Sequence, residues 1–332
     1  MSTLRVAVLG AGSFGSNHIR AIRELPDIEL AGIFDTDRHK AAQFGLPVFQ
    51  SLDEIANAAD CAIVATPTVT HEQVASRLLE AGVDVLIEKP IADSSAAGDR
   101  LARLAAERGR ILQVGHLERF NPAITALEQA LTLPLFFEVH RLSVFTPRSL
   151  DIDVVLDLMI HDLDIVLSFV GELPVEIRAA GISVLSPLVD IANVRLAFAS
   201  GCIANLTASR ISTEKVRKLR LFQPGEYISV DYHRQEAVRL AIRKNEPTGG
   251  FVPQSGFVPQ SGFVPQIGFE SLKSHPGEPL KLELESFFNA VRNRSQPKVD
   301  GIQAANALRV AEAILAKIKE HAELVAETVR RR

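Results

Sequence analysis

The 332-residue sequence has only two cysteines, no excess of positive charge and no long hydrophobic run. Cys61 and Cys202 lie in apolar stretches without metal-ligand spacing, so we expect buried free thiols and a reducing, cytoplasmic setting. The net charge of -4 argues against a nucleic-acid partner or an anionic membrane surface. No apolar run approaches the ~20 residues that span a bilayer, and strand-like sequence from Leu4 leaves no room for a signal peptide.

The composition is that of an ordinary globular protein, with 47% hydrophobic and 23% charged residues. The length is greater than one core usually fills, so we expect about two domains.

The first part of the chain alternates apolar strands with amphipathic helices. The predicted strands are Leu4–Leu9, Ile28–Phe34, Cys61–Ala65, Val83–Ile87 and Ile111–Val114. The predicted helices are Phe14–Glu24, His71–Ala81 and Ser95–Glu107. This alternation is typical of βαβ units, so we predict an α/β, doubly wound parallel sheet of the Rossmann type over residues 1–120.

The second part has a different pattern. A strand at Leu135–Val144 and an apolar helix at Val154–Val170 are followed by several strands without helices between them. The expected strands are Glu176–Val184, Asn193–Ala199, Ile203–Ser209, Lys218–Phe222, Tyr227–Tyr232 and Ala237–Ile242. Two closing helices, Leu280–Val291 and Gly301–His321, complete an α+β domain over residues 121–332 with an open, mostly antiparallel sheet.

One segment is repetitive. Gly250-Phe-Val-Pro-Gln-Ser255 recurs from Gly256 and, with Ile267 as its last residue, from Gly262. Three copies are too few for a β-helix, and the proline in each copy limits strand pairing. We expect residues 244–279 to form a long surface loop, with a functional lid as the alternative.

A glycine-rich turn joins the first strand to the first helix. Gly10, Gly12 and Gly15 match G-x-G-x-x-G: the first permits the tight turn, the second lets a pyrophosphate approach, and the third allows close packing. The helix then begins with Ser13 and Phe14, where free amides and the helix dipole attract phosphates. The pattern predicts a dinucleotide site.

Asp35 ends the second strand, twenty residues after Gly15. A carboxylate there can accept the ribose hydroxyls and repels a 2′-phosphate, so the sequence favours NAD over NADP. Arg38 nearby leaves NADP open as the alternative.

Lys89 follows Glu88 at the end of an apolar strand and precedes a proline. A lysine at this position can direct its ammonium into a crevice and polarise or deprotonate a substrate hydroxyl. The alternative is a solvated lysine at a strand end. Three further residues follow a neighbouring strand at the same sheet edge and, with Glu88, are assigned to the cofactor: Thr66, Pro67 and His71. Thr70 or His71 also suits a helix start.

A polar cluster follows the strand at 111–114. His116, Glu118, Arg119 and Asn121 occur within six residues and suit hydrogen bonding to a sugar. The alternative is a polar linker whose Asn-Pro begins the next helix.

Asp157, His161 and Asp164 are spaced to share one face of an otherwise apolar helix. A carboxylate beside an imidazole fixes its tautomer and raises its basicity, as a general base requires. The spacing matches no common zinc pattern, so we expect no metal site. A surface ion pair on the helix is the other alternative.

From Leu4 to about His321, these motifs resemble the glucose–fructose oxidoreductase / inositol dehydrogenase (Gfo/Idh/MocA) family. The resemblance implies that Lys89 of Glu-Lys-Pro and His161 of the helix are the catalytic pair. The sequence departs from the family's Asp-x-Gly-x-His pattern, because Met159 replaces the glycine.

Val114–Ala123, Pro147-Arg-Ser149, Asp157–Asp164 and Ala208-Ser-Arg210 look most like the branch of UDP-N-acetylglucosamine 3-dehydrogenases. That branch makes a 3-keto sugar nucleotide, which an aminotransferase converts to a diamino sugar for lipid A. Arg148 and Arg210 suit its pyrophosphate, although either fits a surface arginine equally.

The sequence therefore predicts an NAD-dependent dehydrogenase acting on a sugar hydroxyl, with a homo-oligomer (dimer or tetramer) implied by the family. His161, oriented by Asp157 or Asp164, would accept the hydroxyl proton while Lys89 stabilises the alkoxide, although these roles could be exchanged. The alternatives are a dehydrogenase of free sugars or inositol and a regulator that binds NAD without catalysis.

Overall fold

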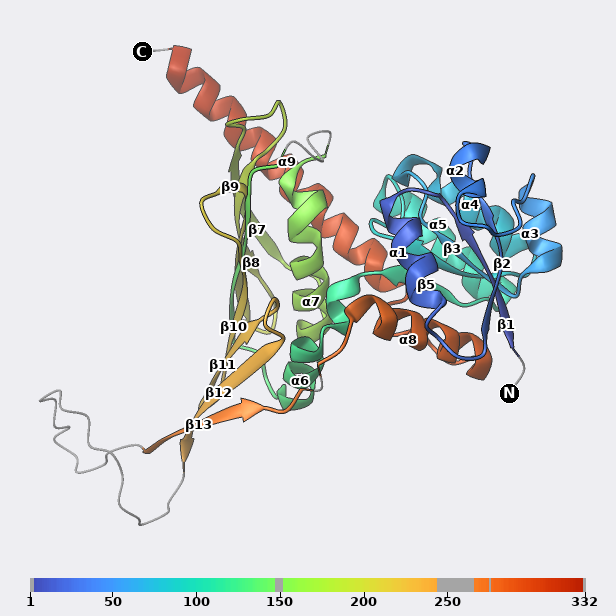
Figure 1. Cartoon of the computed structure of the whole chain (residues 1–332). Coiled ribbons are helices and arrows are strands. Elements are labelled where there is room, and N and C mark those ends of the chain that lie inside the picture. The colour runs from blue at the N-terminus through green and yellow to red at the C-terminus, as the bar shows by residue number, and fades with distance from the viewer. Residues whose placement is uncertain (1–2, 147–151, 244–265, 275, 331–332) are drawn as a thin grey trace, which may run out of the picture.

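The computed structural model describes residues 3–146, 152–243, 266–274 and 276–330. The chain forms two sheets that lie apart, each with its own helices (Figure 1). No helix in these ranges is long and apolar enough to cross a membrane. No group of three or more histidine, cysteine, aspartate or glutamate side chains in them could hold a metal ion.

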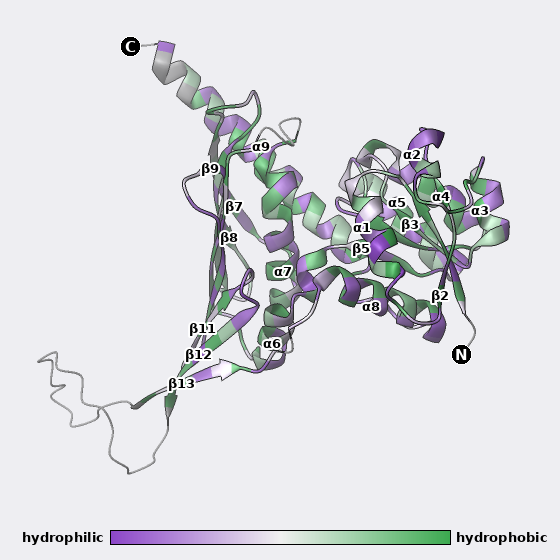
Figure 2. Ribbon diagram, in the orientation of Figure 1, coloured by the Kyte–Doolittle hydropathy of each residue, from purple (hydrophilic) through white to green (hydrophobic). Residues whose placement is uncertain are grey.

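The first sheet is parallel, with the strand order β2-β1-β3-β4-β5, and confirms the Rossmann prediction. Its strands are β1 (Leu4–Leu9), β2 (Ile28–Phe34), β3 (Cys61–Val64), β4 (Asp84–Glu88) and β5 (Leu112–Gly115). Its helices are α1 (Ser13–Ile22), α2 (Arg38–Ala42), α3 (Leu52–Ala58), α4 (His71–Glu80) and α5 (Ser95–Arg108). Figure 2 shows hydrophobic residues along these strands and mixed faces on the helices, as expected for a sheet covered on both sides.

The second sheet has eight strands in the order β13-β12-β11-β10-β6-β9-β8-β7, and only its β6·β9 pair is parallel. The first four along the chain are β6 (Phe136–Val144), β7 (Glu176–Ile182), β8 (Ile191–Ala197) and β9 (Ile203–Ser212). The others are β10 (Val216–Gln223), β11 (Glu226–Asp231), β12 (Glu236–Arg243) and β13 (Gln266–Leu272). The mostly antiparallel prediction is confirmed.

One face of this sheet is covered by helices and the other is open (Figure 1). The covering helices are α6 (Pro122–Ala130), α7 (Ile160–Val170) and α9 (Gly301–Arg330). Leu219 and Leu221 of β10 are buried against them with Phe137 of β6, whereas Lys218 and Arg220 point to the other side.

The segment 244–279 differs from the expected loop. Residues 266–272 form β13, which pairs with β12 from Gln266 opposite Arg243 to Leu272 opposite Ala237. The sequence expectation was wrong here, because the last repeat copy continues into a strand whose phenylalanine and leucine suit an edge position. Residues 244–265, with most of the repeat, lie outside the described ranges.

The helix α8 (Pro279–Asn293) lies against the Rossmann sheet rather than against the second one. Its Leu284, Phe287 and Phe288 share a buried core with Val6 and Ile19. The predicted division at residue 120 therefore needs an amendment: we propose that α8 be counted with the first domain. The longer helix α9 packs against both α5 and α7 and so contacts both domains.

Candidate active site

A cavity of about 290 Å³ lies where the two domains meet, beyond the carboxyl ends of β4 and β5. Ligands of parallel α/β sheets collect at this edge. Its lining consists of Phe14, Asn17, His18, Glu88, Lys89, Gly115, Leu117, Glu118, Arg141, Asp157, Leu158, His161, Arg217, Leu280 and Glu283. The predicted catalytic residues Lys89, His161 and Asp157 are all among them.

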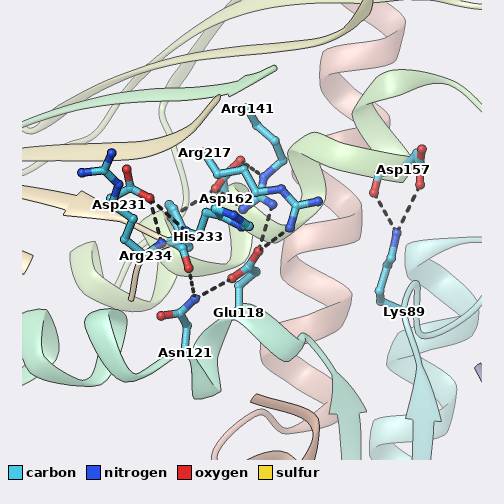
Figure 3. A network of polar contacts seen from close by, with 11 residues as sticks. Lys89, Glu118, Asn121, Arg141, Asp157, Asp162, Arg217, Asp231, His233 and Arg234 are labelled. Carbon is cyan, nitrogen blue, oxygen red and sulfur yellow. Dashed lines mark hydrogen bonds and ion pairs between the residues drawn. The ribbon is translucent and has the colours of Figure 1, made fainter. Parts of the chain in front are cut away.

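Lys89 extends from the end of β4 toward the second domain (Figure 3). Its Nζ donates a hydrogen bond of 2.7 Å to the carbonyl oxygen of Asp157 and lies 3.7 Å from the Asp157 carboxylate. Burial lowers the pKa of Lys89, and the charge of Asp157 opposes that shift. The lysine is thus fixed in position and is easier to deprotonate than a solvated lysine.

The helix bearing His161 begins with a π-helical turn, Val155–Met159, which the sequence did not reveal. Such turns are rare and often lie at functional sites. The turn directs Asp157 to Lys89, and Nδ1 of His161 has no hydrogen-bond partner among the described residues. Burial, followed by the positive charge of Lys89, lowers the pKa of His161 well below its usual value, which keeps the imidazole neutral.

The prediction that Asp157 or Asp164 orients His161 has no support in a hydrogen bond, since none joins His161 to either carboxylate among the described residues. Asp164 instead lies 3.5 Å from Arg119, and both side chains are buried. The i and i+4 rule assumes regular α-helical geometry, which the π-helical turn interrupts between Asp157 and His161. Asp164 follows His161 within the regular helix α7, and its partner Arg119 comes from another segment, which spacing within one helix does not predict.

His116 lies behind His161, with ring centroids 6.2 Å apart in an edge-on arrangement. Neither ring nitrogen of His116 has a hydrogen-bond partner among the described residues, and burial lowers its pKa. Neither His116 nor Arg119 lines the cavity, although both were predicted to contact the substrate. They lie behind the residues that form its wall.

A buried ionic network adjoins the cavity (Figure 3). Arg141 makes two hydrogen bonds to Asp162, of 2.6 and 2.9 Å, and a third of 3.0 Å to Glu118. The hydroxyl of Tyr232 donates to Asp162, and Arg217 lies 3.6 Å from Glu118. Of this network only Glu118 was predicted.

Arg141 and Arg217 carried a weak signal, since each is the charged residue among mostly apolar core-facing positions of its strand. His18, Asn17 and Glu283 were missed as well. His18 lies in the second turn of α1, and nothing in the sequence indicates its partner. Only the fold places Glu88 within 2.6 Å of it.

Asn121 has a structural role. Its side-chain oxygen accepts the amide of Ala123 at the start of α6, and its Nδ2 donates to Glu118 and to the carbonyl oxygen of Tyr232. The alternative that Asn-Pro begins a helix is correct, since α6 begins at Pro122.

The glycine turn has the geometry that a dinucleotide requires. Gly10 has φ +102°, and an added Cβ there would lie 2.4 Å from the carbonyl oxygen of Ala65. At Gly12 a Cβ would meet nothing within 4 Å, so the space above the first turn of α1 is open. The turn is followed by Ser13 and by Phe14, whose exposed ring borders the cavity. These residues fit a bound dinucleotide.

Asp35 stabilises this turn. One carboxylate oxygen accepts the amide of Ala11 at 2.6 Å and the other accepts that of Asp37 at 2.7 Å. Each oxygen has a second lone pair, so the carboxylate can still accept ribose hydroxyls.

His71 is buried and has a structural role, because it contacts two backbone carbonyl groups. Its Nε2 lies 2.8 Å from the carbonyl oxygen of Thr66 and its Nδ1 lies 3.0 Å from that of Pro90. Burial lowers its pKa, and a neutral ring donates to only one of the two oxygens. It links the exposed Thr66-Pro67 loop to the loop that carries Lys89.

Of the two arginines predicted for a pyrophosphate, Arg210 does not line the cavity. It is buried, donates to the carbonyl oxygen of Ile152 and lies 3.7 Å from Asp190. Arg148 lies outside the described residues.

Comparison with known proteins agrees with this arrangement. Residues 4–116 match the model described as "Oxidoreductase family, NAD-binding Rossmann fold", and residues 138–223 match the GFO/IDH/MocA C-terminal domain. The UDP-N-acetylglucosamine 3-dehydrogenase of Acidithiobacillus ferrooxidans is 34% identical, over 94% of this chain and 96% of the relative. The chain belongs to the GFO/IDH/MocA oxidoreductase family.

A solved structure of the Acidithiobacillus family member has a TM-score of 0.87 with 33% identity, and the match covers 97% of this chain and 99% of that one. An inositol 2-dehydrogenase of Rhizobium meliloti is 24% identical over 97% of this chain and 99% of its own. A structure titled as a putative myo-inositol dehydrogenase from Sinorhizobium meliloti has a TM-score of 0.76 at 22% identity, covering 96% of this chain and 98% of that one, which shows the shared fold. This chain is thus a nicotinamide-dependent dehydrogenase of a family that includes sugar and sugar-nucleotide dehydrogenases.

Proposed function

We propose that this protein oxidises the 3-hydroxyl of UDP-N-acetylglucosamine, or of a close UDP-N-acetylhexosamine, to a 3-keto sugar nucleotide with NAD. The observation that carries the proposal is that Lys89 and His161, from different domains, line one cavity beside the glycine turn. The similarity to the Acidithiobacillus enzyme over nearly the whole chain supports the choice of substrate.

The two proton-handling residues have different environments. Asp157 favours the ammonium form of Lys89, so Lys89 suits stabilisation of a developing alkoxide. His161 is neutral, and its Nδ1 has no hydrogen-bond partner among the described residues, so it suits acceptance of the hydroxyl proton. The C–H bond breaks as the C=O bond forms, and bound NAD supplies the hydride acceptor.

We propose NAD rather than NADP as the cofactor. Asp35 already accepts two backbone amides, and its remaining lone pairs suit ribose hydroxyls. Its negative charge repels a 2′-phosphate, and Arg38 is exposed and forms no described bond to it.

We also propose a cytoplasmic homo-oligomer that associates through the open sheet face. Phe136, Phe222, Tyr227, Leu240 and Phe269 form a row across five strands on that face, opposite one another in register. Phe222 lies 5.7 Å from Phe136 and 5.0 Å from Tyr227 between ring centroids, and Phe269 is 70% exposed. An apolar row of this kind marks an association surface. Sedimentation would show a dimer or a tetramer, and a monomer would contradict the proposal.

The test of function is formation of reduced cofactor with UDP-N-acetylglucosamine against a panel of free sugars and inositols. We expect turnover with the sugar nucleotide, with position 3 of the product carrying the ketone. The product would then suit an aminotransferase that precedes lipid A. Turnover confined to free sugars or inositol would favour the second candidate, and tight NAD binding without any turnover would favour a sensor.

A further inference from the structure

Two arginines face each other across neighbouring strands at the cavity. Arg141 of β6 is the direct register partner of Arg217 of β10, and both line the cavity from the helix-covered side of the sheet. Like charges opposite each other on a sheet destabilise it. The pair therefore requires negative charge from elsewhere.

The described carboxylates satisfy Arg141 but not Arg217. Asp162 and Glu118 take all three nitrogens of the Arg141 guanidinium group at 2.6 to 3.0 Å. Within the described part of the chain Arg217 has one ionic contact, its Nη1 at 3.6 Å from a Glu118 oxygen that already accepts from Arg141. The Nε of Arg217 has no hydrogen-bond partner among the described residues, and its side chain is 33% exposed.

Among the described residues that line the cavity, no other carboxylate forms an ion pair with Arg217. Glu88 is bound to His18, and Asp157 is bound to Lys89. Burial raises the pKa of Glu283 well above its usual value, which favours the neutral form of that group. Burial, followed by the charge of Arg141, lowers the pKa of Arg217, which means that its charge is destabilised until an anion arrives.

We propose that Arg217 binds a phosphate oxyanion of the substrate, with Arg141 fixed behind it, so that the cavity selects a phosphorylated or nucleotide-linked sugar over a neutral one. This inference rests on the proposed function for the identity of the sugar. The guanidinium has donors in the fork geometry that pairs with phosphate oxygens bidentately. Arg217 takes the role that the sequence suggested for Arg210, which is occupied elsewhere.

The test is calorimetric binding at saturating NAD, which fills the cofactor's own phosphate site. Three probes are compared: UDP, N-acetylglucosamine 1-phosphate and N-acetylglucosamine. Arg217→Gln should weaken binding of a phosphate-bearing probe by roughly 10- to 100-fold, the loss expected for charged hydrogen bonds, and leave the neutral sugar unchanged. Arg217→Lys, which keeps the charge without the fork, should fall between the two.

Arg220→Gln is the matched control. Arg220 lies on the same strand but on the open face, in a half-buried pair with Glu138 at 2.9 Å, and its loss should change none of the affinities. Weakening of UDP alone places the oxyanion at the nucleotide, whereas weakening of both phosphate probes places it next to the sugar.

Two results would overturn the inference: UDP that does not bind the wild type, or UDP that binds Arg217→Gln and Arg217→Lys as tightly as the wild type. The wild type could bind UDP through Arg217 and yet fail to oxidise UDP-N-acetylglucosamine. That result would support the anion site and refute the proposed function. The melting temperature of each variant shows whether it is folded.

Discussion

Replacing Lys89 by methionine separates the catalytic role of this side chain from its structural one. The change removes a hydrogen bond of 2.7 Å to the Asp157 carbonyl and an ion pair of 3.7 Å. A charged hydrogen bond contributes about 1.5–3 kcal/mol, but burying the ammonium costs several kcal/mol, so the two terms largely cancel. Asp157 remains partly exposed and keeps its hydration. We therefore expect the free energy of unfolding to change by no more than about 1 kcal/mol.

Turnover should change far more than stability. A positioned acid, base or charge contributes roughly 10²- to 10⁴-fold, which corresponds to about 2.7–5.4 kcal/mol of transition-state stabilisation. Steady-state formation of reduced cofactor with the preferred substrate measures this loss, and calorimetry should show unchanged NAD affinity. Wild-type turnover in Lys89→Met would refute the assignment.

The variant Lys89→Arg then distinguishes the two roles left open for the lysine. A guanidinium keeps the positive charge but cannot release its proton at accessible pH. Activity well above that of the methionine variant would mean that Lys89 acts as a cation beside the alkoxide, as we propose. Equal inactivity of the two variants would make Lys89 the base.

Four further substitutions test other parts of the site. Asp157→Asn removes the charge that raises the pKa of the catalytic lysine, so the fall of kcat/KM at high pH should begin at a lower pH. If the fall began at the same pH as in the wild type, the lysine would not be the group that causes it. Gly12→Ala should leave the melting temperature unchanged and weaken NAD binding. Gly15→Ala places a Cβ 1.8 Å from a backbone oxygen, so it should weaken NAD binding and lower the melting temperature as well. The same melting temperature in both variants would contradict the turn geometry. Arg141→Met leaves the buried Asp162 without its cation and should cost about 3–5 kcal/mol in urea unfolding, and a loss near zero would mean that the pair is hydrated.

The local elements were predictable because local patterns determine them. The strands Leu4–Leu9 and Ile28–Phe34 have the predicted bounds, since mostly apolar runs flanked by turn residues leave little choice. The glycine turn and Lys89 were predictable for a related reason: each lies at a strand end, and parallel strands bring their carboxyl ends to one edge.

Features that depend on tertiary register were not predictable. The pairing of Arg141 with Arg217 follows from which residues of β6 and β10 face each other, and one residue of slippage of either strand would move its arginine to the open face. The π-helical turn has no sequence signature, so the partner of Asp157 was assigned to the wrong neighbour. Asp164 pairs with Arg119 of another segment, which spacing along one helix does not reveal.

The position of α8 determines when the protein can fold during its synthesis. The ribosome releases the Rossmann strands first, but Phe287 and Phe288, which fill the core beside β1, follow only after the whole second sheet. Domains usually fold in the order in which they are made. Here part of the apolar surface of the first domain stays uncovered until α8 is made. The core that supports the glycine turn before α1 is therefore complete only when nearly all of the chain has been made.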